Sequence, residues 1–158
     1  MSNVRKRRQR GITMVESLVA LVVMSIGMLG IASLYVTSLK TGRSALVRTQ
    51  AVNLATDIAD RIRSNRAGKG GYETLKYGTD LEAHDCVVKS TCTAAELAED
   101  DLFRWTANLK TFMPDGTTGT VEFKDNSGAL QPNRYTITVA WSEFNEDKPS
   151  TTVLVVDL

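Results

Sequence analysis

The chain has 158 residues and a formal net charge of +1, a length that fits one modest domain plus one further element and excludes two full domains. Its first eleven residues hold five basic side chains (Arg5, Lys6, Arg7, Arg8 and Arg10), which leaves 14 basic against 18 acidic residues in the rest of the chain. That acidic remainder disfavours a general nucleic-acid binder, because such proteins gain much of their affinity by neutralising phosphates.

An uncharged segment of 23 residues follows the basic tip, over residues 17–39. As a helix it would be about 34 Å long, which is enough to cross a hydrocarbon core of about 30 Å. We therefore expect a transmembrane helix there, with the basic tip in the cytoplasm under the positive-inside rule. A plain signal anchor or a cleavable secretory signal would show the same pattern, and Gly30-Ile31-Ala32 offers the small residues of a signal-peptidase site.

Glu16 stands between the basic and the apolar parts of this segment. A carboxylate at the centre of a spanning helix costs about 2.5 to 3.5 kcal/mol and less near the interface, so an acidic residue here is a functional candidate. Neither a plain anchor nor a secretory signal has a use for it. The alternative is that Glu16 only stabilises the helix N-terminus through the helix dipole.

The run GITMVESL at residues 11–18, between the basic leader and the uncharged helix, resembles the class III signal of type IV prepilins and of type II secretion pseudopilins. The resemblance implies that a prepilin peptidase cuts between Gly11 and Ile12 and methylates the new amine of Ile12. Glu16 would then be the fifth mature residue, where the family keeps a glutamate. There it would attract the terminal ammonium of a neighbouring subunit in an apolar filament core and set the register between subunits.

A helical pattern continues beyond Lys40, because apolar residues recur there at spacings of three and four: Val47, Ala51, Leu54, Ile58 and Ile62. One helix over 12–64 would be roughly 80 Å long. We therefore divide the chain into a cleaved leader at 1–11, a long helix at 12–64 with its transmembrane part at 17–39, and a periplasmic domain at 65–158.

Residues 65–92 are rich in glycine and show no clear period, so we expect a loop, which in pilins is variable and exposed. Cys86 and Cys92 lie within it. In the periplasm they would form a disulfide worth roughly 2 kcal/mol, and two free thiols are the alternative. His84 and Asp85 are too few ligands for a metal site, and we expect no cofactor.

The segment Thr93-Ala94-Ala95-Glu96 fits a capping box at the start of a second helix. The apolar face of that helix should contain Ala98, Leu102, Trp105, Leu109 and Phe112, and MPDG at 113–116 should end it. We expect Asp100 and Asp101 to be solvated residues of its first turn. They do not suggest a catalytic pair.

The period then changes to two, which predicts three antiparallel strands joined by hairpins. Val121 and Phe123 alternate in the first strand, the second strand follows the same pattern, and residues 151–156 form the third. The second strand should place these residues on one face: Tyr135, Ile137, Val139 and Trp141. The expected fold is α+β and pilin-like, with the long helix packed on a small antiparallel sheet beside a second, short helix.

The sequences DLFRWTANLKTFMPDGTTGTVEF at 101–123 and TITVAWSE at 136–143 resemble the PilV type of minor pilin, also called type IV pilus modification protein. This resemblance implies a non-enzymatic subunit that helps to initiate or cap a type IV pilus. Its partners would be the prepilin peptidase, other minor pilins, the major pilin and, before assembly, the bacterial inner membrane. A minor pseudopilin of a type II secretion system and a membrane-anchored periplasmic enzyme are the alternatives.

Overall fold

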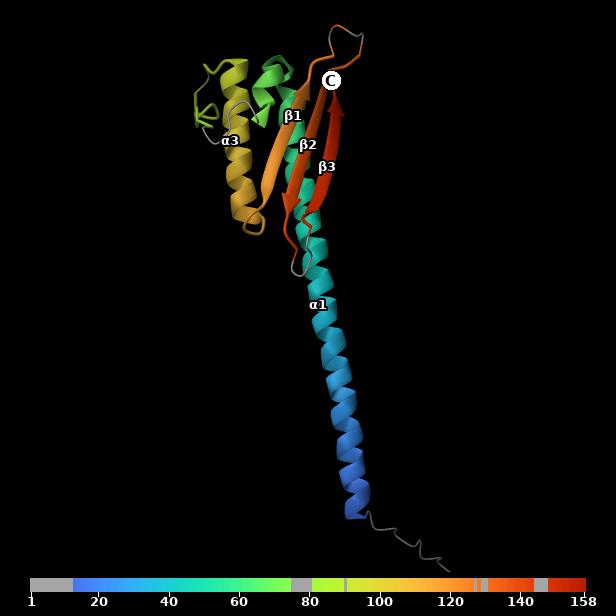
Figure 1. Ribbon diagram of the computed structural model, residues 1–158. Coiled ribbons are helices and arrows are strands. Elements are labelled where there is room, and N and C mark those ends of the chain that lie inside the picture. The colour runs from blue at the N-terminus through green and yellow to red at the C-terminus, as the bar shows by residue number, and fades with distance from the viewer. Residues whose placement is uncertain (1–12, 75–80, 90, 127, 129–130, 144–147) are drawn as a thin grey trace, which may run out of the picture. The chain divides into compact units, whose positions relative to one another are not determined.

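The computed structural model describes residues 13–74, 81–89, 91–126, 128, 131–143 and 148–158. The chain divides into two compact units, Met1–Gly42 and Arg43–Leu158. Helix α1, Met14–Ser64, contributes residues to both units (Figure 1). The predicted end of the long helix at Ser64 is confirmed. Its predicted first residue, Ile12, lies outside the described residues.

Besides the C-terminal part of α1, the second unit contains the 3-10 helix η1 (Arg66–Tyr72), the helix α3 (Ala94–Phe112) and a sheet. The Thr93 side chain accepts a hydrogen bond from the Glu96 N–H, and the Glu96 side chain accepts one from the Thr93 N–H. This is the predicted capping box. Met113 then leaves the helix in an extended conformation, and Gly116 takes a φ of +80° in the turn that follows.

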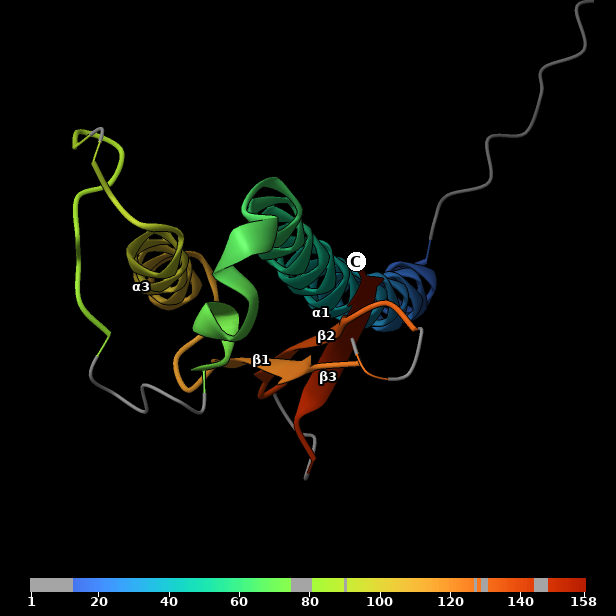
Figure 2. The same cartoon turned by 90° about the horizontal axis from the view of Figure 1, so that it is seen from above.

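The sheet has three antiparallel strands in the order β1 (Thr118–Lys124), β2 (Arg134–Trp141) and β3 (Ser150–Asp157), as predicted. Ile137 in the central strand pairs with Val121 on one side and Leu154 on the other. Figure 2 shows α3 and the C-terminal part of α1 on the same side of this sheet, with η1 between the two helices.

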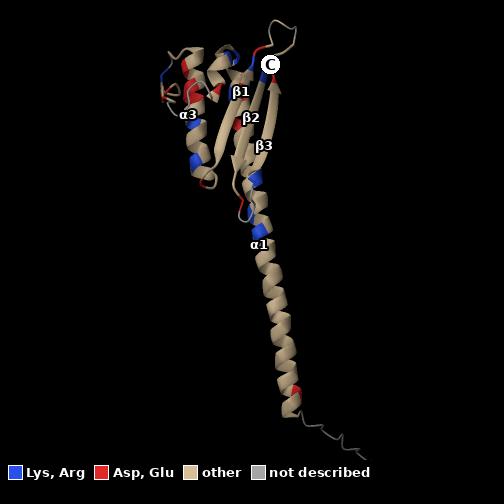
Figure 3. Ribbon diagram, viewed as in Figure 1, with Lys and Arg blue, Asp and Glu red and all other residues tan. Residues whose placement is uncertain are grey.

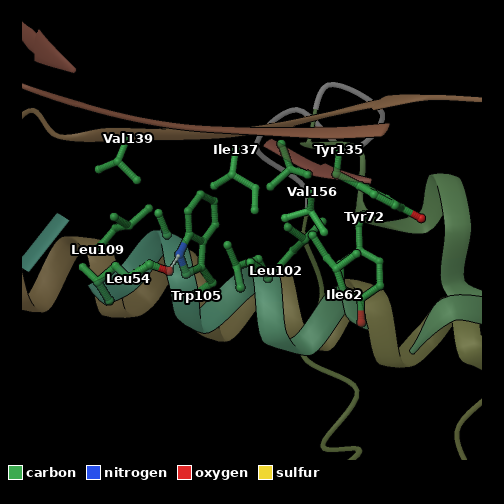
Figure 4. Close-up of a cluster of buried hydrophobic side chains, with 14 of the residues drawn as sticks. Leu54, Ile62, Tyr72, Leu102, Trp105, Leu109, Tyr135, Ile137, Val139 and Val156 are labelled. Atoms are coloured by element: carbon green, nitrogen blue, oxygen red, sulfur yellow. Dashed lines mark hydrogen bonds between the residues drawn. The ribbon is translucent and has the colours of Figure 1, made fainter. Parts of the chain in front are cut away.

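The core of the second unit lies between that side of the sheet and the helices (Figure 4). From α1 it takes Ala51, Leu54, Ile58 and Ile62, with Val47 partly buried beside them, which confirms the predicted apolar face. The alternation along β2 is confirmed as well, since Tyr135, Ile137, Val139 and Trp141 are all buried.

Two predictions about the elements and the apolar packing of this unit were wrong. Phe112 is 58% exposed, and Met113 is buried in its place. The reason is that α3 ends at Phe112, so the extended Met113 turns back towards the core. The glycine-rich segment was expected to be an exposed loop, yet it begins with η1, in which Gly68, Gly71 and Tyr72 are buried.

Candidate functional site

The first unit offers an apolar helical surface. Every described residue from 13 to 43 is exposed, and the part of α1 in this unit reaches a mean hydropathy of 2.3 over its most apolar 18 residues. A helix that is apolar on all sides is stable only when lipid or other apolar helices cover it. By length and composition this helix is a candidate membrane span.

The hydroxyl groups of Ser25, Thr37 and Thr41 are satisfied by the helix itself. Ser25 donates a hydrogen bond to the carbonyl of Leu21 at 2.7 Å, and Thr37 donates one to the carbonyl of Ser33 at 3.1 Å. A hydroxyl without a partner is costly in an apolar environment. These local bonds therefore allow the polar residues to face lipid or a neighbouring helix.

Glu16 lies in the first turn of α1, and its side chain is exposed. Its backbone N–H donates to the Thr13 hydroxyl at 3.3 Å, so Thr13 caps this end of the helix. Sequence reasoning missed this cap, although Thr13-Met14-Val15-Glu16 has the spacing of a capping box. The predicted cleavage site, Gly11 and Ile12, lies outside the described residues.

Cys86 and Cys92 form a disulfide in the second unit, with an S–S distance of 2.07 Å and a Cα–Cα distance of 5.7 Å. The N–H groups of Val88 and Lys89 in the ring both donate to the carbonyl of Asp85, which directly precedes the ring, at 2.9 Å. Val87 and Val88 are 76% and 86% exposed. The ring thus presents two apolar side chains to the surroundings from a covalently closed turn.

The chain before this ring is held on α3 by Asp100. One oxygen of its carboxylate accepts from the N–H groups of His84 and Asp85 at 3.0 and 3.1 Å, and the other accepts from Arg104 Nε at 2.8 Å. Burial by itself raises the pKa of Asp100, but the guanidinium of Arg104 and the two N–H donors outweigh it and hold this pKa below its usual value.

Asp101, the next residue of α3, contacts α1 and η1 instead. Its carboxylate accepts from Arg61 Nη1 at 2.9 Å and from the Tyr72 hydroxyl at 2.7 Å, while Arg61 also binds Asp57. Burial and the neighbouring Asp101 raise the pKa of Tyr72. The carboxylate is therefore part of a bridge between three elements.

The expectation that Asp100 and Asp101 are solvated first-turn residues was wrong. They are only 1% and 8% exposed, and they lie in the second turn of α3. Their burial is possible because each is paired with an arginine and further donors that the sequence alone does not reveal. Both carboxylates consequently serve the packing of the domain.

Comparison with protein families gives two matches. Residues 6–32 match the prokaryotic N-terminal methylation motif, and residues 33–103 match the model described as type IV pilin Tt1218. The first match covers the basic residues ahead of α1 and the first part of that helix, and the second runs through the rest of α1 into α3. No curated protein and no solved structure matches the chain.

Proposed function

Because both family matches support a type IV pilin subunit, we propose that the chain is a minor pilin that helps to initiate or cap a type IV pilus. In this role it would support pilus display, adhesion and twitching motility. The methylation motif implies processing by a prepilin peptidase, and the pilin family implies assembly with other pilins. The resemblance of residues 101–123 to the PilV type supports a minor rather than a major subunit.

One observation carries this proposal, namely an exposed apolar helix with a single carboxylate in its first turn. A membrane anchor needs the apolar surface but gains nothing from Glu16, whose burial in lipid is unfavourable. In a filament the same helix packs among copies of similar helices. The carboxylate then has a partner if a neighbouring subunit contributes a terminal ammonium.

The proposed processing supplies that ammonium. A cut after Gly11 would create a positive amine on Ile12, four residues before Glu16. In adjacent subunits the amine of one and the Glu16 carboxylate of the other would meet only at one axial offset. Glu16 would therefore select the register of a new subunit, because a shifted subunit would leave both charges unpaired in an apolar core.

The Glu16→Gln variant tests this proposal, because it keeps the shape of the side chain and removes its charge. We expect the variant to be inserted and cut after Gly11 but incorporated into sheared filaments far less than the wild type. The loss can reach about 3 to 5 kcal/mol when one partner of a buried pair is removed. Equal incorporation at equal membrane abundance would contradict a role of Glu16 in assembly.

Two control variants separate this effect from others. Thr13→Ala removes the hydroxyl that accepts from the Glu16 N–H and retains the carboxylate, so it tests the helix cap alone. Glu122→Gln makes the same chemical change on an exposed residue of β1. Both controls should be incorporated nearly as well as the wild type. A defect in Thr13→Ala as large as that of Glu16→Gln would assign the effect to helix capping.

A further inference from the structure

The segment before the disulfide ring, residues 81–86, depends on two carboxylates of α3; we call it the stem. The Glu82 N–H donates to Glu99 Oε1 at 3.1 Å, and the N–H groups of His84 and Asp85 donate to Asp100 Oδ1. Because the stem has no regular secondary structure, its backbone donors have no ladder or helix to satisfy them. These acceptors, together with the packing of the partly buried Leu81 on the core, therefore set its position on α3.

The ring of His84 adds a contact of a different kind. Its Nε2 atom lies 3.0 Å from Glu99 Oε2, and the two side chains are 25% and 17% exposed. His84 is the one histidine in the sequence. Histidine is the side chain whose charge ordinarily changes between about pH 5 and pH 8. This contact can therefore switch between a charged pair and a neutral hydrogen bond.

We propose that His84 and Glu99 form a protonation-sensitive latch that holds the stem of the disulfide loop on α3. When the imidazole is protonated, the hydrogen bond to the Glu99 carboxylate is charge-assisted, and such bonds are roughly twice as strong as neutral ones. When it is neutral, the bond persists in weaker form. The latch thereby sets how firmly the Cys86–Cys92 disulfide ring, which carries Val87 and Val88, is held on α3. This inference does not depend on the proposed role in a filament.

The charged groups around the imidazole favour its protonated form. Those on α3 are Glu96, Glu99, Asp100 and Arg104, and those on the stem and the ring are Glu82, Asp85 and Lys89. Figure 3 shows acidic residues on the N-terminal part of α3 and on the adjoining loop. Arg104 is occupied by Asp100 at 2.8 Å and lies 3.8 Å from Asp85. The excess of acidic groups therefore stabilises the imidazolium.

The direction of the pH dependence follows from this arrangement. The hydrogen bond to Glu99 is the main cause that raises the pKa of His84 above its ordinary 6.5, with Glu99, Glu96 and Glu82 adding their charges. In the docked state, the stem lies on α3 and the pKa of His84 is raised. The protonated imidazole therefore stabilises this state fully at a pH below its ordinary pKa. That stabilisation is lost as the pH rises through the raised pKa. The stem should accordingly be held more firmly in mildly acidic than in mildly basic conditions.

Nuclear magnetic resonance on the full-length chain in detergent micelles can test the latch. The ring signals of the single histidine report its titration directly, and the amide protons of His84 and Asp85 report the docking of the stem. Corrected for the intrinsic exchange rate, protection of these amides should fall about two- to five-fold between about pH 5.5 and pH 8, as expected for a partly exposed pair. The midpoint of this change in protection should coincide with the midpoint of the imidazole titration of His84.

Three variants complete the test. In His84→Gln and Glu99→Gln the pH response of the two amides should disappear, whereas Glu122→Gln on β1 should retain it. An unchanged response in His84→Gln would overturn the latch. The latch would also be overturned if the midpoint of the wild-type amide response differed from that of the imidazole titration. It would be overturned as well if the amides showed no response at all while the imidazole titrates. The last two outcomes need no variant, so they decide the question even if a substitution prevents folding.

Discussion

The indole Nε1 of Trp105 donates a hydrogen bond to the backbone carbonyl of Leu54 at 2.9 Å, so the largest side chain of α3 is fixed to α1 (Figure 4). Trp105 is fully buried, and its ring lies among core residues from both helices and the sheet. The bond gives an otherwise apolar contact a defined geometry, because a buried indole N–H that lacks a partner is costly. The α1–α3 contact is therefore both packed and directional.

We predict that Trp105→Phe lowers the free energy of unfolding of the domain by about 1 to 3 kcal/mol, from the lost hydrogen bond and the space left by the smaller ring. Chemical unfolding of the full-length chain in detergent, followed by circular dichroism, measures this loss. Trp141→Phe is the matched control, because the Trp141 Nε1 makes a longer bond of 3.3 Å to Glu143. An equal loss in both variants would show that the bond to Leu54 contributes little.

The side chains of Trp105 and Leu109 pack directly against Gly119 of β1. A Cβ atom at this position would lie 2.6 Å from Trp105 Cη2 and would also collide with Leu109 Cδ1. Overpacking of a core typically costs about 1 to 3 kcal/mol, so we predict that Gly119→Ala destabilises the domain by that amount in the same unfolding experiment. In a Leu109→Ala background the same glycine substitution should cost less than it does in the wild type, and an equal cost in both backgrounds would argue against this contact as its cause.

A second glycine provides the control for this experiment. Gly128 has no atom within 4 Å of its hypothetical Cβ. Gly128→Ala should therefore leave the unfolding free energy within about 0.5 kcal/mol of the wild type, as for most surface substitutions.

The disulfide makes a separate prediction. Alkylation of the denatured, unreduced protein should label neither Cys86 nor Cys92, and reduction before alkylation should label both. Replacing both cysteines by serine should lower the unfolding free energy by about 2 kcal/mol, because a ring this short constrains the unfolded chain only modestly. Labelling of either thiol without prior reduction would contradict the disulfide.

Asp100 should make the domain sensitive to acid. Its pKa in the folded domain lies below the ordinary 3.8, so its stabilising contribution is complete above that value and is lost as the pH falls through the lower one. We predict that Asp100→Asn costs about 1 to 3 kcal/mol at neutral pH. The variant should also lose less stability than the wild type on acidification below about pH 4.

The exposed pair of Arg134 and Asp157 is the matched control for Asp100. Its two ion-pair atoms are 2.7 Å apart, but the side chains are 52% and 40% exposed. Asp157→Asn should therefore change the unfolding free energy by no more than about 1 kcal/mol. A cost at Asp157 equal to that at Asp100 would mean that burial does not distinguish the two carboxylates.

The regular elements could be predicted from the sequence because their periodicity is local. Spacings of three and four identified the buried face of α1, and strict alternation identified the buried face of β2. Phe112 fits the helical spacing equally well, but it is the last residue of α3, and the direction of the chain after it decides that Met113 is buried instead. Periodicity alone does not give this information.

The burial of Asp100, Asp101 and Tyr72 could not be predicted for a different reason. Arg61, the cation that binds Asp101, lies 40 residues away in the sequence, and the donors to Asp100 include backbone N–H groups of an irregular segment. Such partners meet only after the chain has folded. The candidate residue Glu16, in contrast, was singled out from the sequence by a charge at a fixed distance from a glycine and an apolar run, and its role in assembly stays a prediction.

The intact mass and the N-terminal sequence of the chain recovered from sheared pili test the proposed processing and assembly most directly. We expect a chain that lacks residues 1–11 and begins at Ile12 with one added methyl group. The same chain should retain the leader when Gly11 is replaced by a bulky residue. Absence of the chain from pili, or a mature form that begins at Ser33 after cleavage by an ordinary signal peptidase, would contradict the account.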